Sequence, residues 1–211
     1  MMYSSSRAKQ IEKKDVAFLS AGIHDDVFLI GVRYGTSVQG RNFIEFKFVK
    51  DNRTMTHTEW EPRRTTSTGE NLPDDVFYAK VDNQWERIKE ILICYYKEEE
   101  LQYEEEGGFK EYAQWVIDKL STEKVKTTPV RIKAVYSKTG YISLPQYAKY
   151  TFIEPMSTVN EGKSVIVKLG IDLFEKPVVA DTESSTANPF QVVNGTLDNT
   201  SQQNNVDDLP F

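Results

Sequence analysis

The sequence of 211 residues has a single cysteine, two histidines and no long apolar run. One cysteine, Cys94, excludes a disulfide framework within the chain and fits a reducing cytosol. No run approaches the roughly 18 apolar residues that a membrane-spanning helix needs, and no apolar core follows the basic N-terminus as in a secretory signal. We therefore expect a cytoplasmic protein without a membrane partner.

The sequence also lacks the motifs of catalysis and metal binding. It has no phosphate-binding glycine loop, no Gly-x-Ser-x-Gly element and neither His-x-x-x-His nor His-Glu-x-x-His spacing. His24 beside Asp25 and Asp26, with distant His57, is a thin set of metal ligands. The six glutamates within residues 98–106 point around a helix, as on a solvated face. We expect no enzyme activity, no metal and no cofactor.

The net charge of −6 comes from acidic side chains that are concentrated in two segments. Residues 81–123 carry 12 acidic and 5 basic side chains, and residues 177–211 carry 5 acidic side chains without any lysine or arginine. Residues 124–176 carry 9 basic and 4 acidic side chains, and residues 1–80 are nearly balanced. The two less acidic segments are therefore free to present a positive face.

Both ends of the chain have the composition of disordered segments. Residues 1–17 are polar and basic and predict a flexible arm that can touch phosphates. Residues 177–211 bury too little apolar surface to offset the entropy of ordering. In the last five residues a rigid proline and an aromatic ring follow two carboxylates; they are Asp207, Asp208, Leu209, Pro210 and Phe211. This tip predicts a docking motif for a basic pocket on a partner protein, the alternative being a solvated acidic end.

Period-two patterns of apolar residues predict strands in the first third of the chain and again after residue 128. The predicted strands are Val27–Tyr34, Asn42–Val49, Thr54–Trp60, Pro129–Tyr136, Tyr147–Ile153 and Ser164–Phe174. Ile44, Phe46 and Phe48 are expected to face inward. Gly31 predicts a bend or bulge, and Lys50–Arg53 predicts a tight hairpin.

Helical spacing predicts two helices between the third and fourth strands. The first is capped by Asp74 or Asp75 and runs through the glutamates to Gly107, and the second spans Phe109–Leu120. Aromatic side chains at helical spacing usually bury, so Trp85 is expected in the core. The same interpretation applies to Trp115, and Cys94 is expected to be a small buried hydrophobe.

The order of these elements predicts the fold class. Three strands, helices and two further strands are the order of an OB-fold, a five-stranded, partly open Greek-key barrel. We expect a mainly β domain over residues 18–176 with a helical insert at about residues 75–121. The disordered linker and acidic tip at residues 177–211 follow it.

Cations and flat rings recur on the predicted outward faces and loops, as a sequence-tolerant binder of single strands requires. In OB-folds the oligonucleotide crosses the second and third strands between two loops. Those elements are here Tyr34–Arg41, Asn42–Trp60 and Tyr136–Tyr147. The candidate DNA-binding residues are Arg33, Tyr34, Arg41, Phe43, Lys47, Lys50, Arg53, Trp60, Arg63, Arg64, Arg131, Lys133, Tyr136, Lys138, Tyr141 and Tyr147.

Three of these candidates have structural alternatives. Phe43 can instead be half-buried under the helices, with Lys47 merely solvated. Trp60 ends a strand and can equally pack beneath the long loop that follows. Tyr141 lies in a predicted loop tip beside a glycine and has no obvious core to join, so the sequence favours it as a stacking residue.

The polar linker that ends in Asp-Asp-Leu-Pro-Phe resembles the C-terminal tip of bacterial and phage single-stranded DNA-binding proteins, which recruits replication and repair enzymes. Gly22–Pro62 contains Gly-Ile-His-Asp-Asp-Val, Arg-Asn-Phe-Ile-Glu-Phe-Lys-Phe and Thr-His-Thr-Glu-Trp-Glu-Pro. It is similar to the first half of the replication proteins of this class from large tailed phages. The resemblance implies a protein that coats single-stranded DNA without sequence specificity during replication, recombination and repair. It also implies a tip that recruits a polymerase, helicase or nuclease.

Two other functions fit the same features. A protein-interaction adaptor on the same fold would dock a partner through the tip and show no preference for single strands. A recombination mediator would anneal complementary strands. The sequence does not separate annealing from coating, and it leaves self-association open.

Overall fold

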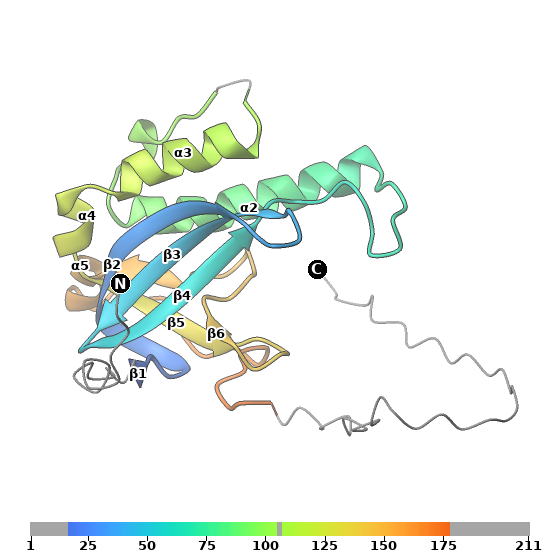
Figure 1. The fold of residues 1–211 in the computed structure, drawn as a ribbon. Helices are drawn as coiled ribbons and strands as arrows, with labels where there is room; N and C mark the ends of the chain where they lie inside the picture. The colour runs from blue at the N-terminus through green and yellow to red at the C-terminus, as the bar shows by residue number, and fades with distance from the viewer. Residues whose placement is uncertain (1–16, 105–106, 178–211) are drawn as a thin grey trace, which may run out of the picture. The chain divides into compact units, whose positions relative to one another are not determined.

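The computed structural model describes residues 17–104 and 107–177, and within them seven strands form one open, mixed sheet (Figure 1). The strand order is β1-β4-β3-β2-β5-β6, and β7 also pairs with β5. The strands are β1 (Ala17–Phe18), β2 (Gly22–Thr36), β3 (Asn42–Lys50), β4 (Arg53–Trp60), β5 (Val130–Tyr136), β6 (Ile142–Ser143) and β7 (Ile153–Pro155). β1 runs parallel to β4, and the other pairs are antiparallel. The prediction of a mainly β domain with helices is confirmed.

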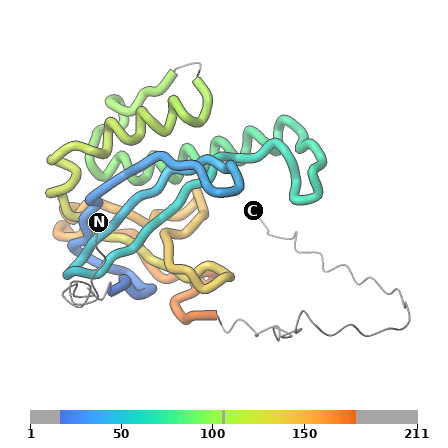
Figure 2. Tube along the Cα trace, in the orientation of Figure 1, coloured from blue at the N-terminus to red at the C-terminus, as the bar shows by residue number. Residues whose placement is uncertain are grey.

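β2 is the longest strand and belongs to both halves of the sheet. Its first part, from Gly22 to Val27, pairs with β5, and its second part, from Phe28 to Thr36, pairs with β3. The register with β3 shifts beside Gly31, which confirms the predicted bulge. Bulges bend a strand and increase its twist. The bent β2 therefore carries the sheet around the core, as the blue part of the chain trace shows (Figure 2).

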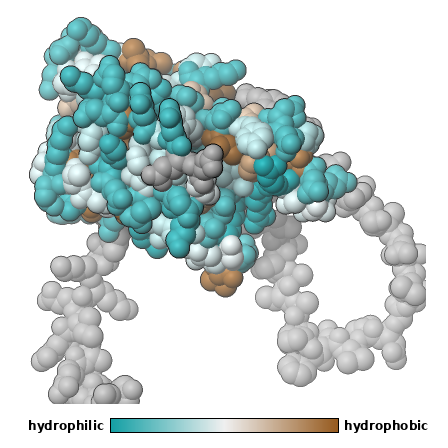
Figure 3. Space-filling model, turned by 90° about the horizontal axis from the view of Figure 1, so that it is seen from above, coloured by the Kyte–Doolittle hydropathy of each residue, from teal (hydrophilic) through white to brown (hydrophobic). Residues whose placement is uncertain are grey.

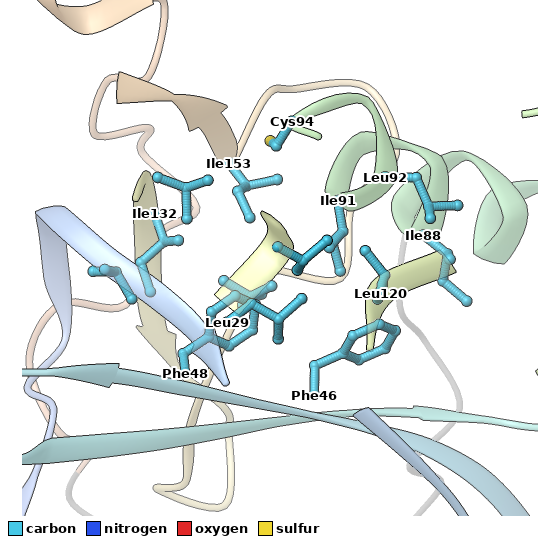
Figure 4. Close-up of a cluster of buried hydrophobic side chains, with 14 of the residues drawn as sticks. Leu29, Phe46, Phe48, Ile88, Ile91, Leu92, Cys94, Leu120, Ile132 and Ile153 are labelled. Carbon is cyan, nitrogen blue, oxygen red and sulfur yellow. The ribbon is translucent and has the colours of Figure 1, made fainter. Parts of the chain in front are cut away.

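The hydrophobic core lies between the concave face of the sheet and helix α2 (Asp74–Ile93), as Figure 4 shows. Ile44, Phe46 and Phe48 are fully buried, as the alternation in β3 predicts. Cys94 is buried as well, and its Sγ donates a hydrogen bond of 3.4 Å to the backbone oxygen of Glu90. The face of β3 and β4 that points away from the core is thereby left for other contacts.

The other helices are η1 (Glu98–Glu100), α3 (Phe109–Leu120), α4 (Glu123–Thr127) and α5 (Met156–Asn160). The second predicted helix is confirmed with the same bounds, and Trp85 stacks on Trp115 with ring centroids 5.8 Å apart. The side of the molecule seen from above is mostly hydrophilic (Figure 3). In the ranges that the structure describes, no helix is both long and apolar enough to cross a membrane.

The first predicted helix is shorter than expected. α2 ends at Ile93, and Glu98–Glu100 form the short 3-10 turn η1. The N–H groups of both Tyr95 and Tyr96 donate to the oxygen of Leu92, which tightens the last turn. Tyr95 and Leu101 are buried in the core, so the chain turns back instead of extending into solvent.

The last two predicted strands are wrong. After β5 the chain forms only the short strands Ile142–Ser143 and Ile153–Pro155, and residues 164–174 form no strand. Two N–H groups of this segment bond to side chains: that of Val165 donates to Glu154, and that of Leu169 donates to Asp172. At these two positions side-chain acceptors replace the ladder that the alternating pattern predicted.

A buried carboxylate on β4 ties the sheet to α2. Arg87 donates from Nε and Nη2 to the two carboxylate oxygens of Glu59, each at 2.7 Å, and the His57 ring contacts Glu59 at 3.1 Å. Burial by itself would raise the pKa of Glu59, but the bonds from Arg87 and His57 outweigh it and lower that pKa to about 2. The carboxylate therefore stays ionised and holds the helix in place.

Candidate nucleic-acid interface

A hollow of about 760 Å³ follows the outer side of β4. This hollow, the β4 groove, has a floor of threonine side chains that alternate with the buried residues of the strand: Thr54, Thr56 and Thr58. One wall comes from β1, and the other comes from the hairpin that joins β5 to β6. Its volume lies in the range of about 300–1,000 Å³ that is usual for small-ligand sites.

Four aromatic rings line the β4 groove: Phe18, Trp60, Tyr136 and Tyr141. Tyr141 is 76% exposed, as its predicted position in a loop tip requires. Trp60 and Tyr136 are half-buried and line the same hollow. Exposed rings of this kind are platforms on which any base can stack.

The β5–β6 hairpin that carries Tyr141 has a tightly bonded tip. The Ser137 N–H donates to the Tyr141 oxygen at 2.7 Å, the Gly140 N–H donates to the Ser137 oxygen at 2.9 Å, and the Tyr141 N–H donates to Ser137 Oγ at 3.1 Å. Gly140 has a φ of 81°, which favours glycine. These bonds hold Tyr141 in position before any ligand binds.

The loop between β2 and β3 repeats this conformation. The Ser37 N–H donates to the Arg41 oxygen at 2.8 Å, the Gly40 N–H donates to the Ser37 oxygen at 2.9 Å, and the Arg41 N–H donates to Ser37 Oγ at 3.1 Å. The common spacing, Ser-x-x-Gly, is visible in the sequence and is a signal from which both tips could have been found. The two loops expected beside an OB-fold groove are therefore equally preorganised.

Cations and rings alternate on the outer face of β2, β3 and β4. The guanidinium of Arg33 lies 5.3 Å from the Phe43 ring centroid, Phe43 lies 5.2 Å from Trp60, and the guanidinium of Arg41 lies 5.0 Å from the centroid of Trp60. A Cβ at Gly35 would lie 2.5 Å from the Phe43 ring, so a glycine lets that ring lie flat on the sheet. These contacts account for the half-burial of Phe43 on the outer face.

Several exposed cations surround the groove and this outer face. They are Lys47, Arg53, Arg63, Lys138 and Lys176. None of them forms an ion pair with another residue in the described part of the chain. Lys50 is half-buried at the end of β3. Arg33 differs, because its Nε donates to Glu45 at 2.6 Å. The free cations are available for phosphates.

Lys133 does not face outward, and that prediction is wrong. Its side chain is 1% exposed, and its Nζ donates to Asp172 at 2.8 Å and to the Tyr147 hydroxyl at 2.7 Å. The segment over residues 164–174 covers this face of β5, which the local alternation could not reveal. Lys133 and Tyr147 are therefore structural residues, away from the groove lining.

Three further candidate DNA-binding residues already contact other side chains of the protein. Arg131 donates to the Asp25 carboxylate at 2.5 and 2.9 Å, which lowers the pKa of Asp25. Arg64 donates to Asp74 at 2.8 Å. The half-buried ring of Tyr34 lies 6.4 Å from Phe109 of α3, on the core side of the sheet. The structure does not bring these three side chains to the groove.

Two groove residues, one aromatic and one cationic, were not among the candidate DNA-binding residues. Phe18 stood only at the start of the predicted domain, and Lys176 lies two residues after the strand predicted at Ser164–Phe174, yet both line the β4 groove. No local pattern marks either one, because their roles depend on pairing with β4 and on the path of the last described residues. The tip residues 207–211 lie outside the described part of the chain.

Among the described residues, no group of three or more His, Cys, Asp or Glu side chains is arranged to hold a metal ion. Comparisons of the sequence with models of protein families and with curated proteins find no match. A functional assignment therefore rests on the chemistry of the β4 groove and its surroundings.

Proposed function

We propose that this protein binds single-stranded DNA in the β4 groove without sequence specificity and coats it during replication, recombination and repair. The observation that carries the proposal is the combination of exposed rings and a hydroxyl-bearing floor along one hollow, with Lys176 in its lining and further exposed cations on neighbouring elements. Rings stack on any base, and cations follow the phosphates, so this combination suits a sequence-tolerant single-strand binder.

We further propose that the sheet is an OB-type barrel. The bent β2 pairs with β3 on one side and with β5 on the other, which supports this arrangement. β6 pairs with β5, and the hydroxyl of its Ser143 lies 2.7 Å from Nδ1 of His57 on β4. This side-chain contact, rather than backbone pairing, links β6 with β4. The loops over residues 37–41 and 137–141 then flank the groove as in OB-folds.

The proposed function includes a second element, the tip at residues 207–211. Its likeness to the tips of single-stranded DNA-binding proteins supports recruitment of a polymerase, helicase or nuclease. Lys176 lines the groove, and the acidic segment continues in the sequence from Pro177, the last described residue. Attraction between this segment and the groove cations would oppose DNA binding at low ionic strength.

Fluorescence anisotropy of a labelled oligothymidine, titrated at several salt concentrations with unlabelled duplex as competitor, tests the binding proposal. We expect tight binding that duplex does not displace. We also expect log K to fall linearly with log salt by about 0.7 for each phosphate contacted. Absence of binding at low salt, for the full chain and for a chain without the acidic tip, would refute the proposal and favour the adaptor.

Truncation after Asn205 tests the tip. The truncated protein is expected to bind oligothymidine more tightly than the full chain at low salt, with the difference vanishing as salt screens the charges. It is also expected to lose capture of the replication or repair enzyme that the full chain binds. Replacing Asp207 and Asp208 by Asn is the control that separates charge from Phe211. Equal DNA binding and equal partner capture by full and truncated chains would contradict this role of the tip.

A further inference from the structure

Phe18 is a large aromatic side chain that the fold holds in solvent. It is 73% exposed, although it belongs to β1 and pairs in register with Thr54 of β4. The next residue, Leu19, is 2% exposed, and its N–H donates to the oxygen of Thr54 at 2.9 Å. The backbone on both sides of the ring is thus anchored, one residue by the sheet and the next by the core. Anchoring fixes the direction of the Cα–Cβ bond of Phe18 without burying the ring.

The Phe18 ring faces the β4 groove. Phe18 lines the same hollow as Tyr141 of the β5–β6 hairpin and the threonines of β4. Figure 1 shows β1 and β6 on the same side of β4. A ring whose backbone is already held loses less conformational entropy than one on a free segment when a flat ligand stacks on it.

We propose that Phe18 is a stacking platform for a nucleobase, so that the N-terminal strand is a working part of the binding site. This inference rests on the proposed function and adds a subsite that neither the strand pattern nor the loop positions indicated. The bound strand then has a ring on each wall of the groove, one from Phe18 and one from Tyr141. Exposing an apolar ring in water is unfavourable, and stacking a base on it removes that surface from water.

Phe18 and Lys176 line the same hollow, so a ring and a cation lie at one site. Ring and charges should act differently on binding, because stacking is nearly independent of salt whereas phosphate contacts release counterions. The salt dependence of affinity therefore separates the contribution of Phe18 from that of the neighbouring cations.

The test compares full-length variants in the anisotropy assay with oligothymidine. Phe18→Ala and Phe18→Leu are expected to weaken binding about 5- to 150-fold, the usual value of one stacked ring, with an unchanged salt slope. Phe18→Trp keeps a stacking face and should bind like the wild type. Lys176→Ala should instead reduce the salt slope by about 0.7. Val165→Ala, at an exposed apolar residue outside the groove lining, is the matched control and should change nothing.

A second measurement does not depend on affinity. Irradiation of the wild-type complex with an oligonucleotide that contains 5-iodouracil should cross-link a base to the peptide that contains Phe18, as mass spectrometry can show. Wild-type affinity in Phe18→Ala, or cross-links confined to other peptides, would overturn the inference while leaving the proposed function intact. Failure of the wild-type protein to bind oligothymidine would refute the proposed function, and this inference with it.

Discussion

Replacing Lys133 by methionine lowers the free energy of unfolding by about 3–5 kcal/mol, the usual cost of leaving one partner of a buried ion pair alone. The Lys133 ammonium and the Asp172 carboxylate are each 1% exposed and 2.8 Å apart. Without the ammonium, Asp172 keeps its charge away from water and loses its principal partner. Chemical denaturation at neutral pH measures the effect.

Two controls identify the cause of this loss. Lys138→Met changes an exposed lysine on the β5–β6 hairpin and should leave the free energy of unfolding nearly unchanged. The double variant Lys133→Met/Asp172→Leu removes both charges and should recover much of the lost stability, because an apolar pair of similar size is tolerated. Folded Lys133→Met should bind oligothymidine as the wild type does. A stable Lys133→Met protein with weakened DNA binding would instead restore Lys133 to the DNA-binding surface.

Replacing Trp60 and Tyr141 together by alanine weakens binding of oligothymidine by about 2–6 kcal/mol, which is a loss of at least about 30-fold. Each stacked ring contributes about 1–3 kcal/mol, and separate sites add. Trp60 lies at the end of β4 and Tyr141 on the β5–β6 hairpin, so both line the groove from different elements. Anisotropy titrations of the two single variants and the double variant measure each share.

The matched control is Tyr150→Ala. Tyr150 is an exposed tyrosine, 50% accessible, but it does not line the groove. Its replacement should leave affinity unchanged. Trp60 also contacts Phe43 and Arg41, so thermal unfolding of Trp60→Ala must show a folded protein before its affinity is interpreted. Unchanged affinity in a folded double variant would contradict the stacking role of Trp60 and Tyr141.

Local sequence patterns predicted the structure correctly wherever contacts between residues close in the sequence determine it. The alternation in Asn42–Lys50, the bulge at Gly31 and the helix Phe109–Leu120 all followed from side-chain periodicity and backbone preference. The same patterns failed at residues 164–174, which alternate like a strand. The N–H groups of Val165 and Leu169 donate to the side chains of Glu154 and Asp172, and such partners leave no periodic trace in the sequence.

The order of residues is enough to predict the supply of rings and cations, the alternation along β3 and the separation of acidic from basic segments. Which of those cations are free depends instead on contacts between distant parts of the fold. Lys133 and Asp172 are 39 positions apart, and Arg131 and Asp25 are 106 apart, yet both pairs form ion pairs. The pairing of β1 with β4 likewise brought Phe18 to the groove. Contacts between distant residues depend on how the whole chain folds, because the packing of remote segments, and not local spacing, sets which charges meet.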